Sequence, residues 1–349
     1  MKNLMFDLAA GREIIDDDKK ISKEVASDKI RNACFEILGI DENTKSEKEI
    51  KRALRSEKAN ELFEVIEEII DTQIEYGYSQ NEFFNQYVEN VNLKDGDKNE
   101  FYVEDDVILT VSEVNGDHHD VSMQRLAEGE SYNIKTSDYV IKVGDDIRLF
   151  LTGKKNWGDF VDAVVKAYLN KVQTMVSTEF ATGVNLIPVP SKLSGNGQLA
   201  PGTVKDNFDA IIEKVAAANG TDVVIMGTKS ALKQLNLFYN SGAGVNWIAP
   251  SQKEAVAHTG FLGDYEGTEL FELQQKYKDK NLTTAIVPNN KLYIMPKVDN
   301  KFIKFVDYGE TELEASEKGA TKDDKQFLEV HRRMGVGTLL TRYHGVWTL

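Results

Sequence analysis

The stretch that decides the fold is GDFVDAVVKAYLNKVQTMVSTEFATG, residues 158–183. Its apolar side chains recur at the three- and four-residue spacings of a helix with one buried face. They are Phe160, Val161, Val164, Val165, Tyr168, Leu169, Val172, Met175, Val176 and Phe180. Gly183 is a fitting residue for the helix to stop at, and about 25 residues make a rod of roughly 35–40 Å. Because its many valines have low helix propensity, this helix depends on packing for its stability.

Upstream of this helix, the sequence has the shorter period of β-strands. The segments FYVEDDVILTVSEV (101–114) and YNIKTSDYVIKVGDDIRLFL (132–151) are rich in β-branched and aromatic residues. Between them lies a polar stretch that begins with the tight-turn signal Asn115-Gly116. The pattern predicts a long two-stranded excursion with a polar tip. Since such a hairpin cannot bury both faces itself, we expect it to pack on another chain.

The first 76 residues are charge-rich and helical in pattern, with no proline. One apolar stripe has helical spacing: it consists of Ala59, Leu62, Phe63, Ile66, Ile69, Ile70 and Ile74. The opposite face is acidic and carries Glu61, Glu64, Glu67, Glu68, Asp71 and Glu75. A helix of this kind must cover its stripe, either with its own core or with a neighbouring subunit. The sequence leaves both alternatives open.

Downstream, residues 185–202 hold three of the six prolines and predict a domain junction. A helix over 204–220, a buried strand over 221–227 and a helix over 228–240 follow, and this alternation favours a second domain of α/β type. Residues 283–298 predict a hairpin that turns at Asn289-Asn290, and residues 300–309 predict another strand. The chain closes on a strand-like segment, residues 336–349.

Composition narrows the classes of function. The 349 residues carry a net charge of -15, and the mean hydropathy is -0.40. No basic stripe is present of the kind that sequence-specific DNA binding requires, and the largest basic cluster, Arg332-Arg333, predicts a solvated or ion-paired surface. No run approaches the roughly 20 apolar residues that cross a bilayer. The single cysteine, Cys34, cannot form an internal disulfide.

The candidate chemical motifs fail on spacing. In VVIMGTKSALKQL, Thr228 separates Gly227 from Lys229, and position 222 is Asp where a phosphate loop needs glycine, so Thr228 or Ser230 is expected to cap a helix. His118 and His119 are adjacent in a strand-like stretch and would point to opposite faces, which argues against a metal site. Cys34 lies among apolar positions and is expected in a core. We expect no catalytic residue, cofactor or metal.

The order of these segments is similar to that of the major capsid proteins of tailed bacteriophages, whose fold is named after the Hong Kong ninety-seven phage and is also used by encapsulins. Three stretches resemble capsid proteins from phages of Gram-positive bacteria: residues 81–105, residues 112–153 and the final segment RRMGVGTLLTRYHGVWTL (332–349). The resemblance covers most of the chain from about Asn81.

The resemblance implies an α+β fold with a helical arm, an extended β-hairpin loop, a peripheral domain built on a long spine helix, and an α/β axial domain. The implied parts are the arm (1–95), the extended loop with peripheral strands (96–153), the spine helix and peripheral domain (154–201), the axial domain (202–298) and the returning strands of both domains (299–349). The loop region 239–258 would then make the axial contact.

The resemblance also implies a structural, non-enzymatic protein that assembles with itself into the pentamers and hexamers of an icosahedral head. The expected contact residues are Asn115, Gly116, Asp117, His118, His119, Arg125, Gly242, Gly244 and Trp247. The head would enclose DNA without reading its sequence, and further partners would be portal, scaffolding and decoration proteins. Such a protein is made in the host cytoplasm, resides in the virion and has no membrane segment. The alternatives are an encapsulin-like shell around protein cargo, and an α/β enzyme with a ligand at the Gly227 turn or the Gly242 loop.

Overall fold

The computed structural model describes residues 7, 15–16, 19–41, 46–53, 56–94, 96–103, 130–143, 155, 157–239, 250–279, 281–297, 300–315 and 328–349. The chain divides into two compact units, each made of three segments. Unit 1 comprises residues 1–95, 136–178 and 305–336, and unit 2 comprises residues 96–135, 179–304 and 337–349. Both units mix helices with sheets, which confirms the predicted α+β class.

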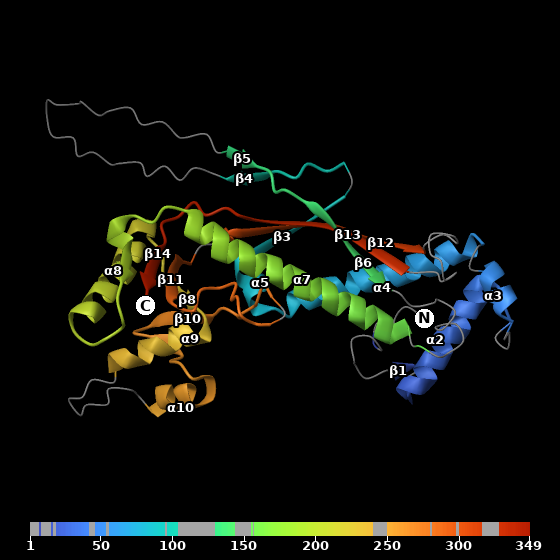
Figure 1. The fold of residues 1–349 in the computed structure, drawn as a ribbon, viewed down its shortest axis with the longest axis horizontal. Helices are drawn as coiled ribbons and strands as arrows, with labels where there is room; N and C mark the ends of the chain where they lie inside the picture. The colour runs from blue at the N-terminus through green and yellow to red at the C-terminus, as the bar shows by residue number, and fades with distance from the viewer. Residues whose placement is uncertain are drawn as a thin grey trace, which may run out of the picture. The chain divides into compact units, whose positions relative to one another are not determined.

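The N-terminal part of unit 1 is helical (Figure 1). Its helices are α2 (Lys23–Leu38), α3 (Glu47–Ala53), α4 (Lys58–Ser79) and α5 (Glu82–Tyr87), preceded by the paired short strands β1 (Ile15–Asp16) and β2 (Lys19–Lys20). Ser22 caps the start of α2, and Gly39 ends it with a positive φ of 67°. The predicted stripe of α4 is confirmed, since every member is at most 8% exposed. Helix α2 packs on α4, so the chain covers this stripe with its own residues.

A four-stranded sheet completes the described part of unit 1. Its strands follow the order β3 (Val88–Leu93), β12 (Ile303–Ala315), β13 (Leu328–Thr338) and β6 (Ser137–Val143). Alternation along β13 sends Val330, Arg332 and Met334 to a buried face, while Arg333 points the other way into solvent. The edge strand β6 pairs antiparallel with β13, and residues 104–114 of the predicted excursion lie outside the described residues.

Helix α7 (Trp157–Leu186) is the long green helix of Figure 1 and contributes residues to both units. Its 30 residues correspond to a length of about 45 Å. Eight of the ten predicted apolar positions are buried, and Leu169 and Met175 are half-buried. The predicted stop at Gly183 is wrong, because the helix continues to Leu186 and ends ahead of Pro188 and Pro190.

The six-stranded sheet of unit 2 has the order β7-β14-β11-β8-β10-β9. Its strands are β7 (Ser194–Asn196), β8 (Val223–Gly227), β9 (Asp264–Tyr265), β10 (Thr268–Glu272), β11 (Lys291–Pro296) and β14 (Gly345–Thr348). The remaining elements are η1 (Ser191–Leu193), α8 (Thr203–Asn219), α9 (Lys229–Leu232), η2 (Lys233–Tyr239) and α10 (Pro250–Thr259). Strand β8 is buried at every position, and α8 ends at Gly220 with a φ of 64°, as the sequence predicts.

Two predictions in unit 2 need correction. The expected hairpin at Asn289-Asn290 does not form: β11 pairs with β8 and β14, which come from distant parts of the chain. Strand β11 is buried over most of its length because it lies inside the sheet, with a strand on each side. The segment before the turn does not pair with β11, and the Ile286 amide donates to the Lys276 carbonyl. The single helix expected over 228–240 is instead α9 followed by the 3₁₀ helix η2. The three-residue period of η2 aligns Leu235 and Phe238 with Leu232 at the end of α9, and all three are buried.

Gly183 is required by a close approach within unit 2. A Cβ at this position would lie 2.5 Å from Thr338 Oγ1 and 2.8 Å from Thr338 Cβ, on the neighbouring end of β13. The Thr338 hydroxyl is itself held 3.4 Å from the carbonyl oxygen of Glu179 in the preceding turn of α7. The glycine therefore allows the helix and the strand to touch, although it does not end the helix.

We predict that Gly183→Ala lowers the free energy of unfolding by about 1–2 kcal/mol, because overpacking outweighs the better helix propensity of alanine. In a Thr338→Gly background, which removes both clashing atoms, the same change should be neutral or stabilising. Chemical denaturation of the four proteins measures the coupling. If Gly183→Ala stabilises the otherwise unchanged protein, the contact does not constrain this position.

Candidate functional site

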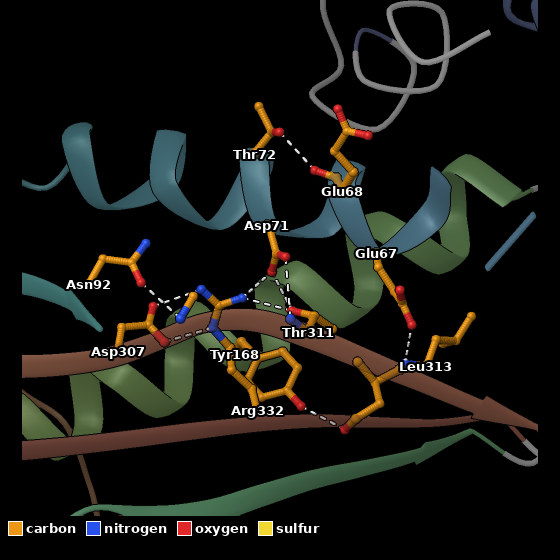
Figure 2. A network of polar contacts seen from close by, with 12 residues as sticks. Glu67, Glu68, Asp71, Thr72, Asn92, Tyr168, Asp307, Thr311, Leu313 and Arg332 are labelled. Carbon is orange, nitrogen blue, oxygen red and sulfur yellow. Dashed lines mark hydrogen bonds and ion pairs between the residues drawn. The ribbon is translucent and has the colours of Figure 1, made fainter. Parts of the chain in front are cut away.

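The most concentrated polar chemistry in the described residues surrounds Arg332 on β13 (Figure 2). Its Nε and Nη2 donate to the two carboxylate oxygens of Asp307 on β12, at 3.0 and 2.7 Å. Its Nη1 donates to Asp71 on α4 and, at 2.7 Å, to the Thr311 hydroxyl on β12. Thr311 also donates its hydroxyl proton to Asp71. One guanidinium thus joins a helix and two strands of unit 1.

The network is buried. The side chain of Arg332 is 1% exposed, that of Asp307 3% and that of Asp71 23%. Burial alone would lower the pKa of Arg332, but the hydrogen bonds and charge of Asp307, with the charge of Asp71, raise it above its usual range. Burial raises the pKa of the Asp307 carboxyl, and the Arg332 bonds oppose that rise. The arginine therefore stays charged, and both aspartates must remain beside it.

Further polar side chains fasten the helices of unit 1 to the same sheet. The Tyr168 hydroxyl on α7 lies 2.7 Å from the Val330 carbonyl oxygen of β13 and 3.2 Å from the Tyr139 carbonyl oxygen of β6. Burial raises the pKa of Tyr168, so its hydroxyl keeps the donor proton. On α4, the Glu67 carboxylate accepts from the Leu313 amide of β12 at 2.6 Å. The helices are thereby held in register as well as packed.

These contacts correct the predicted surface character of two regions. Glu67 and Asp71 belong to the acidic face that the sequence sets opposite the apolar stripe of α4, yet both bind β12. Of the Arg332-Arg333 pair, only Arg333 lies at the surface, where its guanidinium stacks 5.1 Å from the Tyr308 ring centre. The signal that could have located Arg332 is the strand alternation Val330, Arg332, Met334, which places it on an apolar face.

The base of the predicted extended loop belongs to unit 2. Strands β4 (Phe101–Val103) and β5 (Glu130–Tyr132) pair antiparallel, which confirms the root of the excursion, and residues 104–129 lie outside the described residues. Phe101 is buried against the side chain of Lys304, whose ammonium lies 5.9 Å from the ring centre. In contrast, Tyr102 is 62% and Tyr132 41% exposed. The base of the ribbon thus buries Phe101 and presents two large aromatic side chains to solvent.

The expected contact residues cannot be placed. Asn115, Gly116, Asp117, His118, His119 and Arg125, as well as Gly242, Gly244 and Trp247, all lie outside the described residues. The loop region 239–258 is described only from Pro250 onward, apart from Tyr239. These residues therefore remain sequence predictions.

The motifs examined for catalysis have structural roles where the chain is described. Thr228 caps α9 by accepting from the Ala231 amide at 3.4 Å, as expected for an ordinary strand–turn–helix junction. Cys34 is a buried core residue of α2, and burial raises its pKa to about 12. Among the described residues there is no cluster of acidic, histidine or cysteine side chains that could hold a metal. Their helices also include none long and apolar enough to span a bilayer.

Comparison with known proteins gives one match along nearly the whole sequence. The model of the family described as "SPbeta prophage-derived putative capsid protein YonB" matches residues 1–348. No curated protein sequence matches the chain.

Three solved structures illustrate the more distant likenesses. The mature capsid of bacteriophage PhiM1 is 11% identical with a TM-score of 0.47, over 77% of this chain and 87% of that one. A phage-related protein of Bordetella bronchiseptica is 10% identical with a TM-score of 0.47, over 80% and 95%. A virus-like particle from Pyrococcus furiosus is 11% identical with a TM-score of 0.40, over 80% and 98%. At TM-scores below 0.5, none of these carries weight beside the family match.

We predict that Arg332→Met lowers the free energy of unfolding by about 3–5 kcal/mol, because it leaves Asp307 buried without its cation. The adjacent Arg333→Met is the matched control and should change it by no more than about 0.5–1 kcal/mol, since Arg333 is exposed. Urea denaturation measures both.

Adding Asp307→Leu and Asp71→Asn to Arg332→Met should recover part of the loss, because no charge is then stranded. Equal costs for the two single arginine variants would show that the buried network does not control the stability of unit 1.

Proposed function

Because the chain belongs to the YonB family of prophage capsid proteins, we propose that it is the major subunit of a phage head and assembles with itself into pentamers and hexamers. The observation that carries this proposal is the family match over residues 1–348, which leaves only the last residue outside. The element order supports it as well: N-terminal helices, the root of an extended ribbon, one long helix, an α/β unit and returning strands occur in the order expected from the sequence. The protein is in this proposal structural and without enzymatic activity.

The ribbon β4–β5 is proposed as a principal contact between subunits. It is anchored at its base by Phe101 and by the Asn99 side chain, whose amide lies 2.5 Å from the Ile134 carbonyl oxygen. Next to this anchor, Tyr102 and Tyr132 are exposed on a strand pair of three residues each, which is marginal on its own. Aromatic side chains are enriched at protein interfaces, so a neighbouring subunit is the proposed cover for them. Many such modest contacts become strong through multivalency in a closed shell.

The parts expected from the resemblance are proposed to take the corresponding roles. Helix α7 serves as the spine of the peripheral domain, unit 2 contains the axial domain, and the loop region 239–258 meets its symmetry copies at the centre of each capsomer. The net charge of -15 suits a wall that encloses DNA without binding its sequence. Portal, scaffolding and decoration proteins are the proposed further partners, and the virion is the proposed location.

Expression of the full chain followed by negative-stain microscopy and light scattering tests the assembly. We expect rings or closed particles in a range of salt and protein concentrations. Particles recovered from infected or induced cells should contain nuclease-protected DNA, whereas a protein cargo in place of DNA would favour an encapsulin-like compartment. A chain that remains a monodisperse monomer under all conditions would overturn the proposal.

The role of the ribbon is tested by replacing residues 104–129 with Asn-Gly. Val103 and Glu130 are cross-strand partners, so a two-residue turn can join them without disturbing the β4–β5 register. The shortened chain should retain the circular dichroism spectrum and melting transition of the full chain but fail to form closed particles. Normal particles from the shortened chain would rule out the ribbon as a principal contact.

A further inference from the structure

The last residues of the chain form a segment that is bound along its length to unit 2, and we name residues 339–349 the C-terminal strap. The Leu339 amide donates to the Phe302 carbonyl at 2.8 Å, and the Asn219 side chain bonds both the amide and the carbonyl of Tyr343, at 3.0 and 2.8 Å. Strand β14 then pairs with β11 and β7. The Trp347 indole donates to the Gly197 carbonyl at 2.9 Å. The strap completes the sheet and covers part of the core of unit 2.

His344 lies in the strap just ahead of β14 and is 2% exposed. Its ring forms a hydrogen bond with the Val184 carbonyl, and its Nε2 is buried without a partner. A carbonyl can only accept, so Nδ1 is the donor. A second proton would place an N–H on the buried Nε2, which has no acceptor among the described residues, so burial favours the neutral imidazole.

The Val184 carbonyl needs this donor for a reason visible in the sequence. In a continuing helix it would accept from the amide four residues later, but that residue is Pro188, which has no N–H. Val184 lies in the last turn of α7, and a buried carbonyl there without a donor is unfavourable. The strap thus supplies, through His344, the bond that the helix end cannot make for itself.

Among the described residues, no carboxylate raises the pKa of His344. The elements beside it carry the charged groups Glu179 of α7, Lys192 of η1, Glu213 and Lys214 of α8, Lys291 of β11 and Arg342 of the strap, together with the phenols of Tyr293 and Tyr343. Burial lowers the pKa of His344 below its ordinary 6.5, and the Val184 carbonyl opposes this only in part.

We propose that His344 is a proton-controlled latch that holds the C-terminal strap on the end of α7 while neutral and releases the strap when it is protonated. Release moves the imidazole into water, where it can hold its proton without cost. The proposal concerns the folding of unit 2 and does not depend on the proposed function.

The pH dependence follows from linkage. A histidine whose pKa is lower in the bound strap than in the released strap stabilises the bound form above pH 6.5 and loses that contribution as the pH falls through 6.5. The opening equilibrium constant should therefore rise by as much as about tenfold between pH 7.5 and 5.5.

Hydrogen exchange of the full-length protein, read by mass spectrometry and corrected for the intrinsic pH dependence, measures this opening. In the wild type, protection of residues 339–349 should fall by up to about tenfold over this range, while β8 (Val223–Gly227) in the same sheet stays protected. In His344→Asn, whose amide can donate to Val184 but does not titrate, strap protection should not change with pH. His258→Gln is the matched control, because His258 is exposed on α10; it should behave like the wild type.

Three results would overturn the proposal: constant strap protection in the wild type, an unchanged pH response in His344→Asn, or equal loss of protection in β8. If His344→Asn does not fold, His344→Gln takes its place. The pH dependence of strap protection compared with that of β8 in the wild type also tests the proposal without any variant.

Discussion

A guanidinium that has been removed from water must keep its carboxylates within hydrogen-bond reach, and the architecture of unit 1 depends on this constraint. Arg332 can satisfy it only while α4 supplies Asp71 and β12 supplies Asp307. An apolar contact between helix and sheet tolerates small shifts, because dispersion and burial have little directionality. The fork of Arg332 tolerates much less, since its donors have fixed directions. Buried ion pairs add little to net stability, so the clearest consequence of this one is a single arrangement of helix on sheet.

Two kinds of element in the chain differ in how completely the chain itself covers them. Helix α4 has both its apolar stripe and part of its acidic face covered by unit 1, and so needs no neighbour to fold. The ribbon β4–β5 is the opposite case, because its base is fixed by Phe101 while Tyr102 and Tyr132 remain in solvent. An element whose base is anchored and whose aromatic side chains are exposed is suited to assembly, because a second copy can complete its burial.

Local periodicity made much of the fold predictable. The stripe of α4, the long run of α7, the helix α8 with its glycine end and the buried strand β8 are each encoded within one segment. Partners distant in sequence were not predictable in this way. The Asn289-Asn290 turn signal suggested a hairpin, but β11 pairs with two other strands. Gly183 suggested the end of a helix, because its actual role, the close approach to Thr338, involves a residue 155 positions away in the sequence. The ion-paired network of Arg332 could not be predicted without knowing that Asp71 and Asp307 lie beside it. The expected contact residues lie outside the described part of the chain.

Helix α7 takes part in both units, and the chemistry that fastens it differs between them. In unit 1 its anchor is the Tyr168 hydroxyl, whose raised pKa keeps it protonated at every pH a cell or virion meets. In unit 2 the end of the helix is satisfied by His344, whose pKa is lowered by burial. The difference originates in one residue, because Pro188 removes the amide that would otherwise bind the Val184 carbonyl. A proline that ends the helix therefore also gives the last strand of the chain its place and makes that attachment sensitive to protons.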